Sequence, residues 1–161
     1  GGKYAPPPAI AARVRAAYWA TPKPPLSFYE TEPDALHVAV HVRRGDVKEG
    51  SSRYDSDDRI SRCVDVILRI VTAADTTRPA RIHVFSEGRE SDFHFGFNAS
   101  MHVSTPEAEA FHHLVNADVL LIAQSSFSWT AGYLSVGRVF SLSSKRTNHR
   151  VEKCEGVKFD D

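Results

Sequence analysis

The sequence has little of several features that would assign a protein to a class at once. It contains two cysteines, Cys63 and Cys154, which form no CxxC pair and have no histidine at metal-ligand spacing, so a zinc site is not indicated. Two thiols without further context are usually free. We therefore expect Cys63 to be a buried apolar residue, with a Cys63–Cys154 disulfide as the less favoured alternative. No apolar run approaches the roughly 20 residues that span a bilayer, and no signal-peptide pattern opens the chain.

An excess of charge of one sign is also missing. Twenty Lys and Arg residues balance twenty Asp and Glu residues, so the field of the whole molecule favours neither a nucleic acid nor an anionic membrane as a partner. Any basic site must therefore be local. The 161 residues, 42% of them hydrophobic and 25% charged, fit one globular domain of ordinary size.

The N-terminal segment, residues 1–34, is rich in proline. Six of the nine prolines form two clusters, at 6–8 and at 22–25. Between the clusters, Ala9–Ala20 has apolar residues at helical spacing, and Pro8 suits the start of a helix. We expect a short helix and a connector that lead from something upstream into a domain over residues 35–161.

From Ala35 onward, apolar strands alternate with helices. Strands are predicted at Ala35–Val42, Arg81–Phe85, Met101–Val103, Val119–Ile122 and, as the last one, Arg138–Leu142; helices are predicted at Asp58–Ala74, Pro106–Asn116 and Phe127–Ser135. Asp57 or Asp58 is the expected N-cap of the first of these helices. The alternation predicts an α/β fold, a Rossmann-like parallel sheet with helices on both faces, whose ligands bind at the carboxyl ends of the strands.

The first predicted strand ends in the basic sequence His41-Val42-Arg43-Arg44-Gly45-Asp46. Arginine binds phosphate bidentately and stays charged, a glycine lets the backbone turn closely, and His41 and Arg43 share one strand face. The pattern indicates a phosphate site. In the alternative interpretation, both arginines pair with Asp46 and other carboxylates, and His41 is a core residue. Arg44-Gly45-Asp46 also spells an adhesion tripeptide, which recurs too often by chance to indicate adhesion.

Two further strand ends carry polar residues. Ser125, Ser126 and Ser128 lie at a predicted helix start, where free backbone N–H groups bind anions; capping of the helix is a compatible alternative. The strand ending at Phe85 is followed by Ser86, Glu87, Gly88, Glu90 and Asp92. These carboxylates either contact a ribose or a base, or are surface charges.

Three segments, in this order, resemble the donor-binding half of GDP-fucose-dependent fucosyltransferases, namely the α-1,2, α-1,6 and protein O-fucosyltransferase groups. They are HVRRGD at 41–46, IHVFSEG at 82–88 and FHHLVNADVLLIAQSSFSWTAGYLS at 111–135. The resemblance covers Leu36–Leu142. It implies a glycosyltransferase of the GT-B architecture, with two Rossmann-like domains, in which this chain is the C-terminal domain of a longer protein.

The resemblance also implies roles for individual residues. Arg43 would grip the β-phosphate of GDP and stabilise the leaving group, Arg44 would shape the loop or help to bind the donor, and His41 would line the same pocket. The family's Ser-Ser-Phe turn, which meets the phosphates, is matched by Ser125, Ser126, Phe127 and Ser128. The sequence departs from the family at two points. Family members usually have an acidic residue before the helix with FHHL that reads guanine, for which Glu109 in Thr105–Glu109 is the candidate, and Ser86-Glu87 stands where they often have an Asp pair.

Such enzymes invert the sugar configuration without a divalent metal, so the resemblance implies no cofactor or metal, only GDP-fucose or a similar nucleotide sugar as donor. Asp46, then Glu49 and Asp55, are candidate general bases for the acceptor hydroxyl. The expected partners are the nucleotide sugar and a glycan or protein acceptor. The compartment would be the secretory pathway in a eukaryote and the cytoplasm in a bacterium.

Two other functions stay open. One is a non-catalytic nucleotide- or glycan-binding α/β domain. The other is a phosphatase or another phosphate-handling enzyme, for which neither His41–Asp46 nor Gln124–Ser128 offers a convincing nucleophile.

Overall fold

The computed structural model describes residues 7–142 and 151–154. The remaining parts of the predicted N-terminal segment and of the predicted domain 35–161 lie outside the described residues. Six strands form one sheet: β1 (Leu36–His41), β2 (Ala80–Ser86), β3 (Ser100–Val103), β4 (Val119–Ile122), β5 (Arg138–Ser141) and β6 (Val151–Lys153). Their order is β3-β2-β1-β4-β5-β6, and every neighbouring pair is parallel. The predicted α/β class with a Rossmann-like parallel sheet is confirmed.

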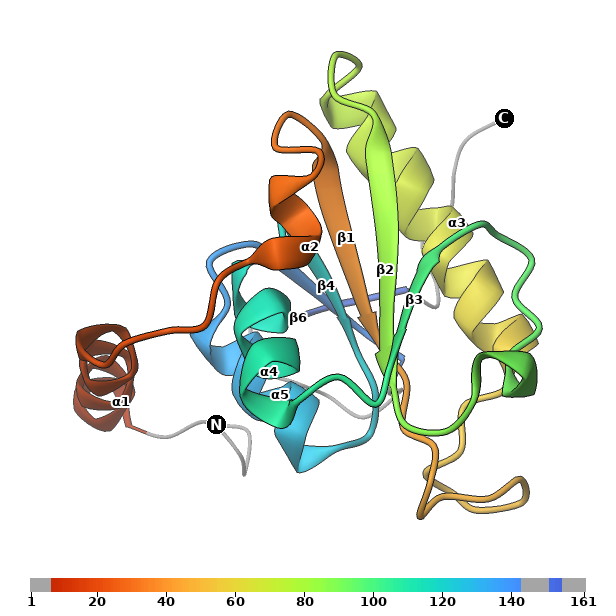
Figure 1. Cartoon of the computed structure of the whole chain (residues 1–161), viewed down its shortest axis with the longest axis horizontal. Helices are drawn as coiled ribbons and strands as arrows, with labels where there is room; N and C mark the ends of the chain where they lie inside the picture. The colour runs from red at the N-terminus through yellow and green to blue at the C-terminus, as the bar shows by residue number, and fades with distance from the viewer. Residues whose placement is uncertain (1–6, 143–150, 155–161) are drawn as a thin grey trace.

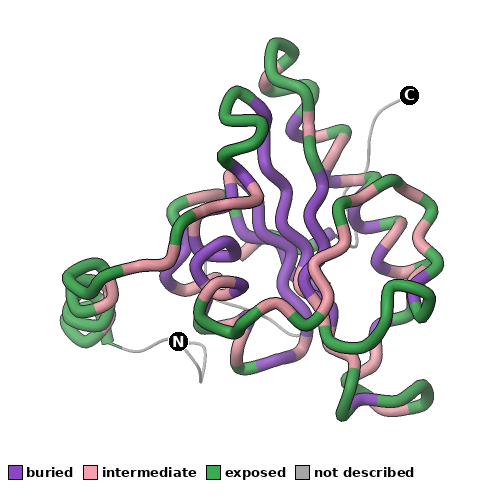
Figure 2. Tube along the Cα trace, viewed as in Figure 1, coloured by how far each residue is buried: buried purple, intermediate pink, exposed green. Residues whose placement is uncertain are grey.

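Helices cover both faces of this sheet (Figure 1). They are α1 (Pro8–Ala20), α2 (Ser27–Glu30), α3 (Asp57–Ala74), α4 (Glu107–Asn116) and α5 (Ser126–Leu134), with a short 3-10 turn, η1 (Glu90–Asp92). Helix α3 lies on one face, and α2, α4 and α5 lie on the other. Helix α1 stands away from the sheet and buries none of its residues (Figures 1 and 2).

Two apolar cores fill the two faces, because successive side chains of a strand point to opposite sides. Val38 and Val40 of β1 belong to the core against α3, and Ala39 between them belongs to the core against α4 and α5. All three are fully buried. Burial on both faces explains why the central strands are almost continuously apolar. Figure 2 shows these strands as the most buried part of the chain.

Three details of the predicted elements are wrong. Ser56, and not Asp57 or Asp58, is the N-cap of α3, because its hydroxyl accepts the Arg59 backbone N–H at 3.3 Å. β5 is not the last strand, since β6 pairs with it. The four-residue helix α2 was not predicted at all. Both α2 and β6 are too short for a hydrophobic period to reveal them.

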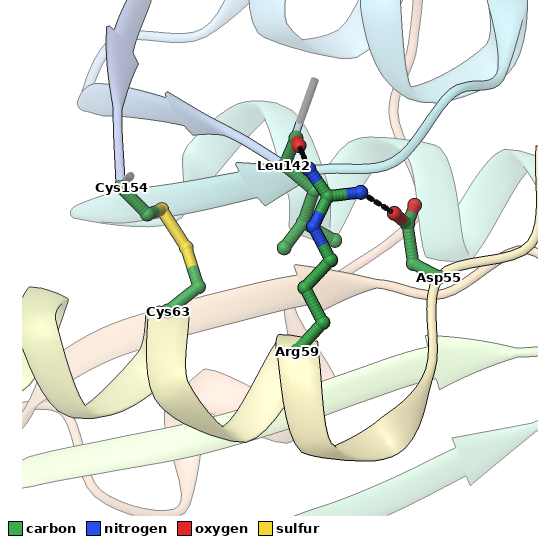
Figure 3. Close-up of a disulfide and its surroundings, with 5 residues drawn as sticks. All are labelled: Asp55, Arg59, Cys63, Leu142 and Cys154. Atoms are coloured by element: carbon green, nitrogen blue, oxygen red, sulfur yellow. Dashed lines mark hydrogen bonds and ion pairs between the residues drawn. A yellow bond between two sulfur atoms is a disulfide. The ribbon is translucent and has the colours of Figure 1, made fainter. Parts of the chain in front are cut away.

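The expectation of free thiols is also wrong. Cys63 of α3 and Cys154, directly after β6, form a disulfide with their Cα atoms 5.2 Å apart (Figure 3). One turn earlier on α3, Arg59 donates to the carbonyl oxygen of Leu142 and, at 2.7 Å, to the carboxylate of Asp55. Helix α3 is therefore tied to the ends of both β5 and β6.

Candidate functional site

The strand order identifies the carboxyl ends of β1 and β4 as the part of the sheet where a ligand site is expected. From β1 the chain proceeds through β2 and β3 on one side, and from β4 through β5 and β6 on the other. β1 and β4 are neighbours, with Val38 opposite Val119 and Val40 opposite Leu121. The loops after these two strands therefore leave in opposite directions, which opens a crevice at their carboxyl ends, the position where open α/β sheets bind ligands.

The arginine loop and the serine turn, which were predicted to share one edge of the sheet, both lie at this crevice. The Arg43 loop follows β1, and the serine turn follows β4. The two loops also contact each other, because the side-chain amide of Gln124 donates to the carbonyl oxygen of Ser52 at 3.3 Å. The structure thus brings the two candidate phosphate-binding elements together.

Arg43 is held by a carboxylate of its own loop. Its Nε lies 3.1 Å from Asp46 Oδ1, and its Nη2 lies 2.6 Å from Asp46 Oδ2. This bidentate pair lowers the pKa of Asp46 and raises the pKa of Arg43. The nearby negative charge of Glu87 also raises the pKa of Arg43. The carboxylate pairing expected in the alternative interpretation is therefore found for both arginines, because Arg43 pairs with Asp46 and Arg44 pairs with Asp57. The same geometry shows that the guanidinium can hold a two-oxygen anion at this point.

Arg44 points away from Arg43 and braces the loop. Its Nη2 donates to the Asp57 carboxylate at 2.6 Å and to the Asp55 carbonyl oxygen at 2.9 Å. Its guanidinium lies 4.1 Å from the centre of the Tyr54 ring, and the side chain is only 10% exposed. Arg44 therefore fixes the backbone of the loop, one of the two roles that the resemblance implies for it.

Gly45 is a position where the loop requires glycine. Its φ of +76° lies in the left-handed region, and a Cβ atom there would come 2.1 Å from Glu87 Oε2. The carboxylate of Glu87 thus lies directly against the arginine loop. Ser86 fastens the same two loops, because its hydroxyl donates to the Val42 carbonyl oxygen at 2.7 Å.

The four residues of the serine turn differ in what they offer a ligand. Ser128 is fully buried and donates to the carbonyl oxygens of Ala123 and Ser125, so its hydroxyl shapes the turn. Ser125 occupies the N-cap position, but its side chain makes no capping hydrogen bond. Ser126 is exposed. The first intrahelical donor is Trp129, which leaves the backbone N–H groups of 126–128 at the crevice.

His41 and Phe127 form the apolar floor between the two loops. Their ring centroids are 5.4 Å apart, and Phe127 also packs edge-on against Phe111 at 5.3 Å. Burial and, to a smaller extent, the charge of Arg43 lower the pKa of His41 to about 4. His41 is therefore neutral near pH 7. Its Nδ1 is buried and has no hydrogen-bond partner within residues 7–142 and 151–154.

A groove of about 410 Å³ adjoins Phe127. It is lined by Tyr18, Thr21, Pro22, Lys23 and Pro24 of the N-terminal segment, by Glu107, Ala108 and Phe111 of α4, and by Phe127. Glu109 is not among these lining residues, and its carboxylate accepts a hydrogen bond from the Ser27 hydroxyl at 2.9 Å. Glu107, two residues earlier, provides the carboxylate of the groove.

The remaining candidate acids lie in different surroundings. Asp55 is 3% exposed and is paired with Arg59, whereas Glu49 is exposed. Asp92 accepts the Arg89 backbone N–H at 3.0 Å and so caps η1.

Comparison of the chain with protein-family models, with curated proteins and with solved structures finds no match. No family is established. The fucosyltransferase resemblance therefore depends on the motif residues alone. In the part of the chain that the structure describes, no group of three His, Cys, Asp or Glu side chains is arranged to hold a metal ion. No helix in that part is long and apolar enough to cross a membrane.

Proposed function

We propose that this domain binds a nucleoside diphosphate sugar, with the diphosphate between Arg43 and the first turn of α5. The observation that carries the proposal is the position of these two elements on either side of the β1/β4 crevice. A fixed guanidinium and free helical N–H groups are complementary to a diphosphate in charge and in hydrogen bonding. In the free protein the Asp46 carboxylate is bound to the Arg43 guanidinium. The incoming phosphate takes the place of this carboxylate.

The groove beside Phe127 suits the base of the nucleotide. Phe111 and Phe127 supply apolar ring surface, and Glu107 supplies a carboxylate that accepts hydrogen bonds from base N–H groups. Guanine has two such groups on one edge, which a carboxylate can accept together. Glu107 therefore replaces Glu109 as our candidate for reading the base.

The reaction that this arrangement supports best is inverting glycosyl transfer, as in a fucosyltransferase, to a glycan or protein hydroxyl. As the bond between the sugar C1 and the phosphate oxygen breaks, the leaving diphosphate gains negative charge. Arg43 is fixed in position and stabilises that charge without reorganising, an effect for which one lost donor typically costs about 2.7–4 kcal/mol. Among the three candidate bases, Asp55 is buried against Arg59, so Asp46 and Glu49 are the ones that an acceptor can reach.

A nucleotide panel tests the binding proposal. GDP should raise the melting temperature of the wild-type protein more than GMP, because only GDP has the second phosphate. The Arg43→Ala variant should lose this effect. The matched control is Arg69→Ala, which removes an exposed arginine of α3 that pairs with Asp65. If GDP, GMP and UDP all leave the wild-type melting curve unmoved, the nucleotide proposal is wrong.

A non-catalytic nucleotide-binding domain is the second candidate. It is favoured if Asp46 stays paired with Arg43 when the nucleotide binds, because this pairing lowers the pKa of the carboxylate and makes it a weak base. The two candidates differ in their products: a transferase domain releases GDP from GDP-fucose, alone or within a longer chain that contains it, and a binding domain does not.

A further inference from the structure

Four buried or half-buried histidines lie beneath α2, apart from the arginine site. They are His37 of β1, His83 of β2, His102 of β3 and His113 of α4, and we call them the histidine cluster. Because β1, β2 and β3 are neighbours, the first three form a row across the sheet. His37 Nδ1 lies 3.1 Å from His83 Nε2, and His83 Nδ1 lies 3.0 Å from His102 Nε2.

The hydrogen bonds of this row fix one neutral tautomer for each ring. His37 Nε2 lies 3.1 Å from the carbonyl oxygen of Glu32, which can only accept, so Nε2 carries the proton and Nδ1 accepts. His83 must then donate from Nε2 and accept at Nδ1. His102 donates from its Nε2 in turn. The row can take up one further proton at His102 Nδ1 with these bonds intact, but a proton on His37 Nδ1 or on His83 Nδ1 would set two N–H groups against each other.

His113 connects the cluster to α2 directly. Its Nδ1 donates to the carbonyl oxygen of Glu109 at 2.8 Å, and its Nε2 accepts the backbone N–H of Phe28 at 3.2 Å. Its own carbonyl oxygen accepts the Tyr29 hydroxyl at 2.9 Å. A proton on His113 Nε2 therefore removes the acceptor of the Phe28 N–H.

The aromatic residues of α2 stack on the same rings. The Phe28 ring lies parallel to His102 with the centroids 3.9 Å apart, and the Tyr29 ring lies parallel to His37 at 4.3 Å. Tyr29 is 6% exposed and belongs to the core of this face. Phe28 and Tyr29 of α2 are thus packed directly on imidazole rings of the cluster.

We propose that the histidine cluster is an acid-sensitive latch, whose neutral rings hold the N-terminal segment on the sheet and whose protonation releases it. The released part would include α2 and the connector that forms one side of the groove beside Phe127. This inference is independent of the nucleotide proposal.

Few charges face the cluster to compensate for added protons. Those that do are Glu32 and Asp118 at His37, opposed by Arg78; Glu109 at His102 and His113; and Glu30 at His113. Burial outweighs them and lowers the pKa of all four rings. Together with repulsion from His102, His37 and His113 it lowers the pKa of His83 to about 3, and together with repulsion from His113 it lowers the pKa of His102 to about 4. Tyr29 stays neutral, since burial raises its pKa.

The sign and steepness of the effect follow from proton linkage. Once released, the histidines have an ordinary pKa of about 6.5. Between about pH 4 and 6.5 the released state binds more protons than the docked state, so docking weakens as the pH falls. Each additional proton changes the docking equilibrium tenfold per pH unit, and release with two protons changes it about 100-fold per unit.

Amide hydrogen exchange between pH 6.5 and 4.5, without nucleotide, tests the latch. The protection factor of the Phe28 amide should fall about 100-fold per pH unit, while that of Val40 in β1 stays constant until the whole domain unfolds. If the protection of Phe28 does not depend on pH, or changes only together with that of Val40, the proposal is overturned.

Two variants separate titration from structure. His113→Gln keeps one donor for Glu109 and one acceptor for Phe28 but cannot titrate, so the pH dependence of Phe28 should weaken by up to about tenfold per unit. The control His94→Gln changes an exposed histidine outside the cluster and should behave as wild type. If His113→Gln does not fold, His102→Phe keeps a ring against Phe28 and carries the same expectation. Equal pH dependence in the cluster variant and the control overturns the proposal.

Discussion

Removal of the Cys63–Cys154 disulfide should cost the folded state several kcal/mol. The bond joins positions 91 residues apart, so without it the unfolded chain regains the conformational freedom of a long loop. The loop-entropy relation gives about 4.6 kcal/mol at 25 °C for a loop of this length. For a chain of this size each kcal/mol corresponds to about 2–4 °C, so the melting temperature should fall by about 9–18 °C.

The structure indicates which part of the sheet depends on the bond. β6 is a three-residue edge strand that pairs only with β5 among the described strands, and its Glu152 forms an exposed ion pair with Arg138. Exposed pairs of this kind contribute about 0.2–1 kcal/mol each, too little to hold an edge strand. The disulfide adds a covalent attachment of the end of β6 to α3.

The assay is thermal unfolding of the wild type and of Cys63→Ala/Cys154→Ala, each with and without a thiol reductant. Reductant should lower the melting temperature of the wild type to about that of the double variant and leave the double variant unchanged. The reasoning is refuted if the unfolded, unreduced wild type titrates with two free thiols, or if the double variant melts at the wild-type temperature.

Two further predictions concern the crevice. Ser126→Asp should affect stability and binding in opposite directions. An acid in the first turn of α5 stabilises the helix by about 0.3–1 kcal/mol but repels the diphosphate, so we expect a higher melting temperature and weaker GDP binding. Equal GDP binding would contradict the placement of the diphosphate. Asp46→Asn removes the carboxylate that competes with phosphate for Arg43. Calorimetry should therefore show tighter GDP binding by this variant than by the wild type or by the control Asp65→Asn. Unchanged or weaker binding would show that phosphate does not replace Asp46 at Arg43.

Much of the fold could be predicted because its main elements are long and strongly patterned. The strand β4 was predicted at its observed ends, and α3 shows its buried face at Ile60, Val64 and Ile67. The carboxyl edge of the sheet as the place of the ligand loops also followed from the alternation of strands and helices, because that alternation predicts parallel strands. The four-residue strand β4 is apolar throughout, whereas the similarly short β6 and α2 have no apolar run and were missed.

The sequence could not show which residues far apart along the chain pair with each other in the fold. Cys63 and Cys154 belong to no common sequence motif. Their pairing becomes evident only from the position of β6 beside β5 in the sheet. In the same way, Glu109 was expected at the base, yet the unpredicted helix α2 provides Ser27 as its partner. The histidine cluster is the clearest case, since its members come from four elements that only the folded sheet brings together.

At the arginine site, sequence identified the residues but could not decide between their two interpretations. Arg44 is a structural residue, bound to Asp57 and packed on Tyr54. Arg43 is paired too, but with an exposed carboxylate of its own loop, which a ligand can replace. The difference lies in burial, and a sequence of adjacent arginines does not show which one turns inward.

Calorimetric titration with GDP of the wild type, Arg43→Ala, Arg43→Lys and the control Arg69→Ala tests the central claim most directly. A charged hydrogen bond contributes about 1.5–3 kcal/mol, so Arg43→Ala should weaken GDP binding about 10- to 150-fold. Arg43→Lys should lose most of this as well, because lysine lacks the bidentate fork. Arg69→Ala should bind as wild type. Equal GDP affinity in the wild type and Arg43→Ala, or no GDP binding by the wild type, would contradict a diphosphate site at the β1/β4 crevice.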